Sequence, residues 1–156
     1  MAKKKANVRV GDIFAIRIGK NMYSYGQVVA QGTTSDSMII YDIISDEHPS
    51  VEEIIGRQIV FFINTVDVEI EDGKWVIVGN AQIPKHLVFP QYITETLEGY
   101  KVLSHKGEVL GIANEYQIKE LKPVTSYSPI ILEDAVKAKY GYEDWYAELD
   151  NIVYKL

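Results

Sequence analysis

The stretch IFAIRIGKNMYSYGQVVAQ, residues 13–31, decides the fold class of this 156-residue chain. Residues 13–18 are rich in β-forming side chains, and the turn residues Gly-Lys-Asn follow at 19–21. Residues 22–31 form a second run of the same kind, which can pair with the first as a hairpin. A short apolar run at 38–44 then predicts a strand buried on both faces. The first part of the chain is therefore expected to be an antiparallel sheet.

The middle of the chain continues this pattern after one short helix. Ser50 stands three residues before Glu53, which is the spacing of a capping box, and Gly56 is placed to end the helix. Residues 57–70 form the longest β-like stretch, with apolar and acidic residues alternating towards its end, as in a half-buried strand. Asp72-Gly73 then predicts a hairpin whose returning strand is 74–78.

The last third changes character from strand to helix. Residues 99–103 and 108–112 are candidate strands, and 116–121 is a further one. Ser128-Pro129 predicts a helix start, apolar residues at helical spacing follow, and Gly141 predicts the end. Residues 143–149 indicate one or two further helical turns.

The predicted fold is β-rich, a mostly antiparallel sheet or partly open barrel with a C-terminal helix, and α+β is the alternative label. We expect a single domain, 1–156, in which residues 1–7 are a disordered basic N-terminus and residues 128–156 are a helical C-terminal extension.

Composition and charge restrict the classes of function that this chain can have. The chain has no cysteine, which excludes disulfides and thiolate metal sites and fits a reducing compartment. The N-terminal sequence MAKKKANVRV lacks the apolar stretch of a secretory signal, and no apolar run is long enough to cross a bilayer, so a cytoplasmic location without membrane contact is expected. The net charge is −6, and residues 42–72 carry nine acids against Arg57 alone. A nucleic-acid-binding surface requires the opposite balance.

No motif in the sequence indicates catalysis. The three histidines, His48, His86 and His105, are far apart, and neither H-E-x-x-H nor a glycine-rich phosphate loop is present. The acids ahead of Gly73 do not follow the spacing of a calcium loop. We therefore predict no catalytic residue, no metal and no cofactor.

Four segments in order resemble a known family: residues 11–16 (GDIFAI), 23–29 (YSYGQVV), 40–42 (IYD) and 73–79 (GKWVIVG). Together with the apolar strand 59–63 and Phe89-Pro90, they resemble immunity protein 26 of bacterial polymorphic toxin systems over roughly residues 8–100. The resemblance implies a β-rich protein that binds and blocks the toxin of its own cell or its siblings, often a nuclease. The residues shared with the family are expected to be scaffold: Gly11, Asp12, Tyr25, Gly26, Trp75 and Gly79.

The charge map adds a mechanism to this resemblance. Nuclease toxins hold a polyanion, so their clefts tend to be basic, and an acidic binder is steered to such a cleft. Two acidic patches are candidates for partner binding. The first is Asp42, Asp46, Glu47, Glu52 and Glu53; the second, in the aromatic tail, is Glu143, Asp144, Trp145, Glu148 and Asp150.

Two other readings remain open at this stage. One is a small-molecule- or peptide-binding β-barrel module, in which some of the eleven tyrosines would line a pocket. The other is an enzyme on an unfamiliar small scaffold. The sequence does not indicate an oligomeric state.

Overall fold

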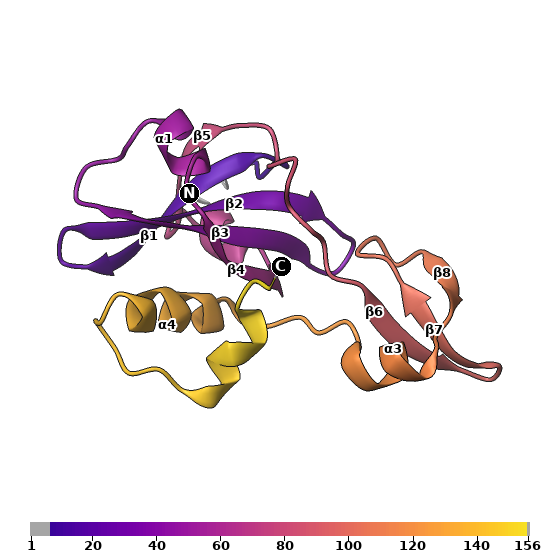
Figure 1. Ribbon diagram of the computed structural model, residues 1–156. Coiled ribbons are helices and arrows are strands. Elements are labelled where there is room, and N and C mark those ends of the chain that lie inside the picture. Colours follow the sequence, from indigo (N-terminus) through magenta and orange to yellow (C-terminus); the bar gives the residue numbers. More distant parts are fainter. Residues whose placement is uncertain (1–6, 156) are drawn as a thin grey trace. The chain divides into compact units, whose positions relative to one another are not determined.

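The computed structural model describes residues 7–155, which form two compact units (Figure 1). Unit 1 takes the described residues up to Pro84 and again from Ser126, and unit 2 is Lys85–Thr125. The basic residues 1–6, most of the N-terminus predicted to be disordered, lie outside the described residues.

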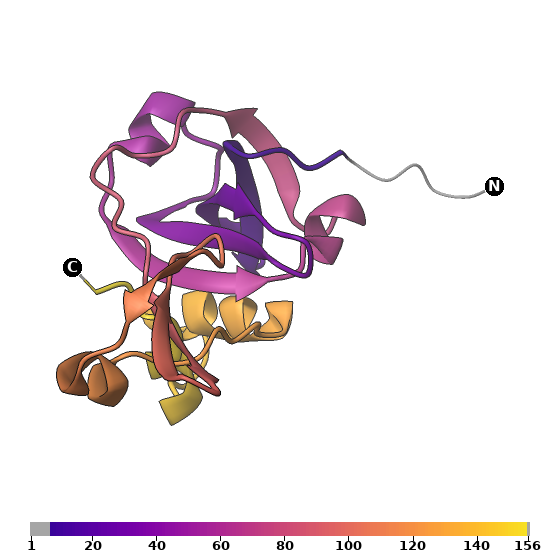
Figure 2. The same cartoon turned by 90° about the vertical axis from the view of Figure 1, so that its right-hand side faces the viewer.

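Unit 1 contains a five-stranded antiparallel sheet in the order β4-β3-β2-β1-β5. Its strands are β1 (Asp12–Gly19), β2 (Met22–Gln31), β3 (Asp36–Ser45), β4 (Ile59–Thr65) and β5 (Val76–Asn80). The predicted hairpin at residues 19–21 joins β1 to β2, with Ala15 opposite Tyr25. Irregularities in the register of every pair bend the sheet, so that its strands cross at large angles in Figure 2.

Four short helices accompany this sheet: α1 (Val51–Ile55), α2 (Val68–Glu71), α4 (Pro129–Lys139) and the 3-10 helix η1 (Ala147–Ile152). Ser50 caps α1 by accepting a hydrogen bond of 3.2 Å from the backbone N–H of Glu53, as the sequence predicts. Ser128 caps α4 in the same way through Ile130. The apolar face of α4 covers the sheet (Figure 1) and buries Ile131, Leu132, Ala135 and Val136.

The core of unit 1 is centred on a pair of stacked aromatic rings. The indole of Trp75 lies 5.4 Å from the ring of Phe14, nearly parallel to it, and only 1% of Trp75 is exposed. Gly26 faces Phe14 from β2, where an added Cβ would lie 2.6 Å from Phe14 Cζ and 2.6 Å from the carbonyl oxygen of Ile39. The absence of a side chain at residue 26 therefore lets the sheet pack against this pair.

Unit 2 is a small three-stranded antiparallel sheet with one helix: β6 (Tyr92–Thr96), β7 (Gly99–Leu103), β8 (Val109–Ile112) and α3 (Glu115–Glu120). Its buried residues are Ile93, Val102 and Ala113, with Leu121 packed against them. All four residues of β8 are exposed.

The predicted fold class is confirmed: two antiparallel sheets dominate, a helix follows Ser128, and the strands of the described residues form no closed barrel. The prediction for residues 65–71 is wrong, because 68–71 form α2. As a strand this segment would bury three apolar side chains, but Val66 and Val68 are exposed and Ile70 alone is buried.

The predicted hairpin at Asp72-Gly73 is also wrong. Gly73, with a φ of 78°, follows the end of α2, and β5 pairs with β1 instead of β4. This pairing makes β5 the edge strand of the sheet, next to β1 and far from β4, and it places Trp75 against Phe14. Residues 116–121 are likewise not a strand: the side chains and backbones of Asn114 and Gln117 form a reciprocal capping box that starts α3.

One ionisable group is buried at the start of β3. Asp36 is 8% exposed, and its Oδ2 has no hydrogen-bond partner among the described residues. Burial, and then the neighbouring carboxylate of Asp67, raises the pKa of Asp36 to about 6. In the unfolded chain an aspartate has a pKa of about 3.9, so the folded state holds this proton more tightly.

We expect Trp75→Ala to lower the free energy of unfolding by about 3–5 kcal/mol, because it leaves a cavity beside Phe14. Chemical denaturation measures this loss. Tyr116→Ala is the control, since that residue is 73% exposed. A Trp75 variant that unfolds like the parent would show that the stacked pair is not the centre of the core.

We expect Asp36 to reduce stability as pH rises from about 4 to about 6, and to keep it reduced above that range, by about 1–3 kcal/mol. The raised pKa of an acid means that stability is present while the group is protonated and is lost as it ionises. The difference in unfolding free energy between Asp36→Asn and the parent, measured by urea denaturation across this range, should therefore grow in favour of the variant. The exposed Asp46→Asn is the control. A difference that does not change with pH would contradict the assignment.

Candidate partner-binding site

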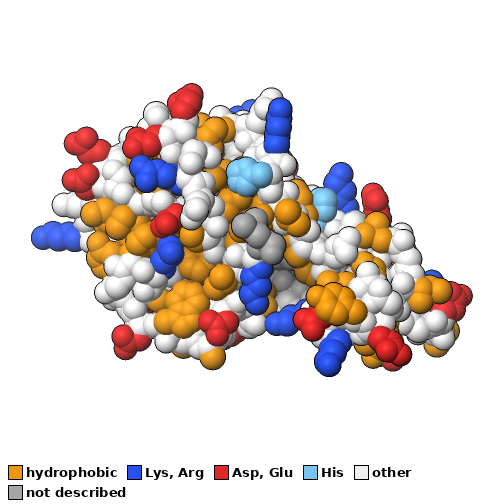
Figure 3. Space-filling model, in the orientation of Figure 1, with side chains coloured by type: hydrophobic (Ala, Val, Ile, Leu, Met, Phe, Trp, Pro, Cys, Tyr) orange, Lys and Arg blue, Asp and Glu red, His pale blue; other side chains and the backbone are white. Residues whose placement is uncertain are grey.

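An open groove of about 500 Å³ lies where β3 ends and the chain turns towards α1, entirely within unit 1. It is lined by residues 42–49 together with Glu53, Arg57 and Tyr140. Four of the five acids of the first predicted patch therefore meet at one place, and Glu52 lies beside them on the exposed side of α1. Figure 3 shows acidic side chains over α1 and the loop ahead of it, at the upper left of the view.

The acids of the groove fall into two groups. Asp42 is engaged: its Oδ1 accepts a hydrogen bond of 2.8 Å from the hydroxyl of Tyr140 and lies 4.0 Å from Nζ of Lys139. By contrast, no ion pair joins Asp46 or Glu47 to a base of the described residues, and both side chains are exposed. Glu53 is 3.6 Å from Arg57, an exposed pair that contributes little to stability. The groove therefore keeps uncompensated negative charge at its open side.

A histidine holds the loop that carries Asp46 and Glu47. Nδ1 of His48 lies 2.8 Å from the hydroxyl of the buried Tyr25, and its ring also meets Tyr23 edge-on at 5.0 Å. Burial raises the pKa of Tyr25 to about 12, so its hydroxyl stays protonated at neutral pH. His48 thus anchors the acidic loop to the sheet.

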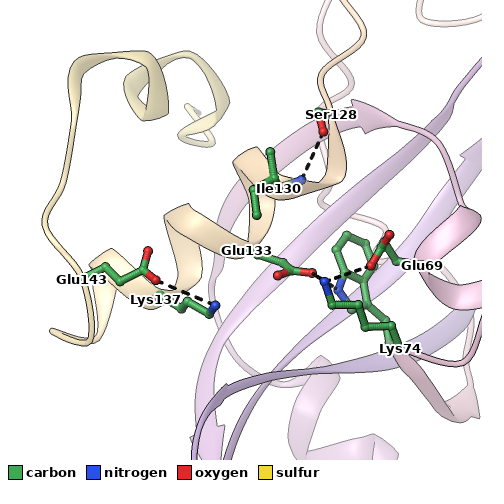
Figure 4. A network of polar contacts seen from close by, with 8 residues as sticks. Glu69, Lys74, Ser128, Ile130, Glu133, Lys137 and Glu143 are labelled. Carbon is green, nitrogen blue, oxygen red and sulfur yellow. Dashed lines mark hydrogen bonds and ion pairs between the residues drawn. The ribbon is translucent and has the colours of Figure 1, made fainter.

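The other wall of the groove depends on how α4 is attached to the sheet (Figure 4). The buried Glu133 of α4 points at two neighbouring residues of the segment before β5. Its Oε1 accepts a hydrogen bond of 3.1 Å from the indole N–H of Trp75 and lies 2.9 Å from Nζ of Lys74. Hydrogen bonds to Glu133 and to Glu69, 3.2 Å away, raise the pKa of Lys74. These contacts fix α4, and Tyr140 at its C-terminal cap therefore reaches Asp42.

More side chains of the second predicted patch than of the first are engaged in contacts within the chain. Trp145 stacks on the buried Phe61 at 6.1 Å and donates a hydrogen bond of 2.8 Å to Asp150. The hydroxyl of Tyr146 donates one of 2.6 Å to Asp134, and Glu143 lies 3.8 Å from Lys137. Asp144 and Glu148 are exposed. Much of this aromatic and acidic tail therefore holds the C-terminal segment against unit 1.

The sequence did not indicate the contact between Asp42 of the first patch and Tyr140 at the end of α4. The two residues are 98 positions apart in the sequence, and no local pattern predicts that they meet. The only available signal was that Tyr140 continues the apolar face of the predicted helix.

Neither metal ligation nor membrane crossing is indicated in residues 7–155. No three His, Asp or Glu side chains there are grouped to hold a metal ion. None of the helices in that range is long and apolar enough to span a bilayer.

Comparison with known protein families places most of this surface in a family. The family model described as Immunity protein 26 matches residues 9–99, a range that contains the whole five-stranded sheet, α1 and the acidic groove except Tyr140. No curated protein and no solved structure matches the chain.

Proposed function

The chain belongs to the immunity protein 26 family, and we propose on this basis that it binds a cognate bacterial toxin and neutralises it by protein–protein contact. The observation that supports this proposal is the acidic groove at the end of β3, which lies in the part of the chain matched by the family model. The partner we propose is a nuclease domain acting in the same cytoplasm.

The charge of the groove suits such a partner. A nuclease cleft attracts a polyanion and is therefore basic, and exposed carboxylates without basic neighbours attract a basic surface. Asp46 and Glu47 meet that description, with Glu52 and Glu53 beside them on α1. We propose these four acids as the main contact and the tail residues Glu143, Asp144, Trp145 and Glu148 as a second one.

The residues that the resemblance gives as shared with the family lie in the scaffold. Asp12 is buried and accepts hydrogen bonds from Arg9 and Asn80, while Gly11 has a φ of 94° that suits glycine. At Gly79 an added Cβ would lie 2.4 Å from Val51 of α1. Their roles in the core and in the backbone turns support assigning partner contact to the exposed acids.

The arrangement of the tyrosines gives less support to a small-molecule-binding module. Tyr25 and Tyr41 are fully buried, and the hydroxyl of Tyr41 donates a hydrogen bond of 2.6 Å to Gln27 within the core. They pack the sheet and do not line the groove. Binding to a protein surface, without catalysis, fits an open acidic groove better.

We expect neutralisation of the first patch to slow toxin capture. The variant Asp46→Asn, Glu47→Gln, Glu52→Gln, Glu53→Gln should associate with the toxin at least about 10-fold more slowly at low salt, because steering by exposed charge accelerates association 10-fold or more. Stopped-flow association with the product of the adjacent toxin gene measures this rate at several salt concentrations. The parental rate should fall towards that of the variant as salt rises.

The matched control neutralises four exposed acids of unit 2: Glu95→Gln, Glu98→Gln, Glu108→Gln and Glu115→Gln. It changes net charge by the same amount and should leave the association rate closer to the parental value. Neutralising Glu143, Asp144, Glu148 and Asp150 tests the second patch. If the toxin associates equally fast with all these variants at low salt, electrostatic capture by the groove is wrong. If no toxin domain binds the parent, the proposed function is wrong.

A further inference from the structure

The three strands of unit 2 carry apolar side chains on both faces of their sheet (Figure 1). Residues opposite each other in an antiparallel pair point to the same face, and successive residues alternate between the faces. Ile93 lies opposite Val102, and both belong to the buried cluster of unit 2, so they mark its inner face. The outer face consists of two rows across β6, β7 and β8: Tyr92, Leu103 and Val109, then Thr94, Lys101 and Ile112.

This outer face is more apolar than a solvated sheet face normally is. An antiparallel sheet with one face in water alternates apolar and polar side chains along its strands. β8, with the sequence VLGI, has no polar side chain, yet Val109 is 60% exposed and Ile112 is 78% exposed. Beside them on the outer face, Tyr92 and Leu103 are half-buried. The sequence of β8 is therefore typical of a strand buried on both faces, whereas its side chains are open to solvent.

The charged residue of the outer face does not oppose apolar contact. Nζ of Lys101 lies 3.1 Å from Oε2 of Glu98, which is in the turn between β6 and β7. The ammonium is therefore directed to the end of the sheet, where an acid compensates it. The stem of a lysine is itself apolar and covers neighbouring apolar surface. A partner placed on this face thus meets apolar side chains and no uncompensated charge.

The charge of unit 2 favours a second copy of the chain as that partner. Unit 2 carries five lysines and five glutamates, so the net charge of −6 falls on the rest of the chain. Two copies of unit 2 can therefore meet without net repulsion, whereas two copies of the acidic unit 1 repel each other. A balanced surface also gives no electrostatic attraction to the basic partner proposed for the acidic groove.

We propose that the outer face of unit 2 packs against the same face of a second copy, so that the two three-stranded sheets form a sandwich about a two-fold axis. Such an axis places the same apolar rows on both sides of the contact. This contact is separate from the acidic groove and goes beyond the proposed function, since it needs no toxin.

The size of the face sets the strength of this contact. Three strands about 4.8 Å apart, with about five residues each, give a face of about 14 Å by 16 Å. Stable complexes bury roughly 800 Å² on each partner, which is more than this face offers. We therefore expect a weak, reversible dimer that forms as the protein concentration rises.

Sedimentation equilibrium of the full chain, from about 10 μM to about 1 mM, tests for this dimer. We expect a dimer whose dissociation constant does not rise with NaCl, because the contact is apolar and salt screens the repulsion between the acidic units. The double variant Val109→Lys, Ile112→Lys should raise the dissociation constant at least about 10-fold, because it removes apolar burial and places like charges in the contact.

The matched control is Val76→Lys with Ile130→Lys in unit 1. These two side chains are each 50% exposed, and the control adds the same two charges to the chain, so it should dimerise more tightly than the unit 2 variant. Ile112→Thr keeps a β-branched side chain in β8 and should weaken the dimer by a smaller factor. Circular dichroism should show the same fold in all these variants, since they replace exposed side chains.

NMR of a mixture of labelled and unlabelled chains locates the contact. We expect intermolecular nuclear Overhauser effects among the methyl groups of Leu103, Val109 and Ile112. A chain that stays monomeric at about 1 mM would overturn the inference. So would a dimer that the unit 2 variant leaves unchanged, or intermolecular effects that involve unit 1 alone. A monomeric parent whose unit 2 variant loses toxin binding would assign the outer face to the toxin instead, and would leave the proposed function standing.

Discussion

The buried carboxylate of Glu133 is the contact on which the arrangement of unit 1 depends. A bent five-stranded sheet leaves an apolar face that must be covered, and α4 covers it. Burying Glu133 in that interface is unfavourable unless its oxygens find donors, and the indole of Trp75 and the ammonium of Lys74 provide them. Because Trp75 also stacks on Phe14, a single side chain of α4 joins the helix to the aromatic centre of the core.

This attachment has consequences for the surface. With α4 fixed at Glu133, its last turn carries Tyr140 to the end of β3, where it occupies one oxygen of Asp42. On the other side of the groove, Tyr25 in the core holds His48 and thereby the acidic loop. Both walls of the groove are thus fixed by hydrogen bonds that begin in the core, and its free acids lie on a surface that needs little reordering before a partner binds.

The strands with local signals could be predicted from the sequence, and so could the capped helices. The turn at Gly19-Lys20-Asn21, the cap at Ser50 and the Ser128-Pro129 helix start are each set by a few adjacent residues, and all three are present. Residues 65–73 misled the prediction because alternation and an Asp-Gly pair are also compatible with a short helix and the turn after it. What decides between them is the distant pairing of β5 with β1, which no local pattern encodes.

The contrast between local signals and distant pairing also applies to the acids at the two ends of β3. The acidic groove could be anticipated because its carboxylates are close together in sequence, within residues 42–53. The approach of Asp67 to the buried Asp36 could not, because it arises only through the pairing of β3 with β4. Acids that stabilise this fold, such as Asp12 and Glu133, have donors within the chain, whereas Asp36, Asp46 and Glu47 do not stabilise it through any ion pair of the described residues. Since repulsion among carboxylates opposes folding, the exposed acids of the groove do not add to the stability of the fold, and this supports the proposal that they serve a positively charged partner.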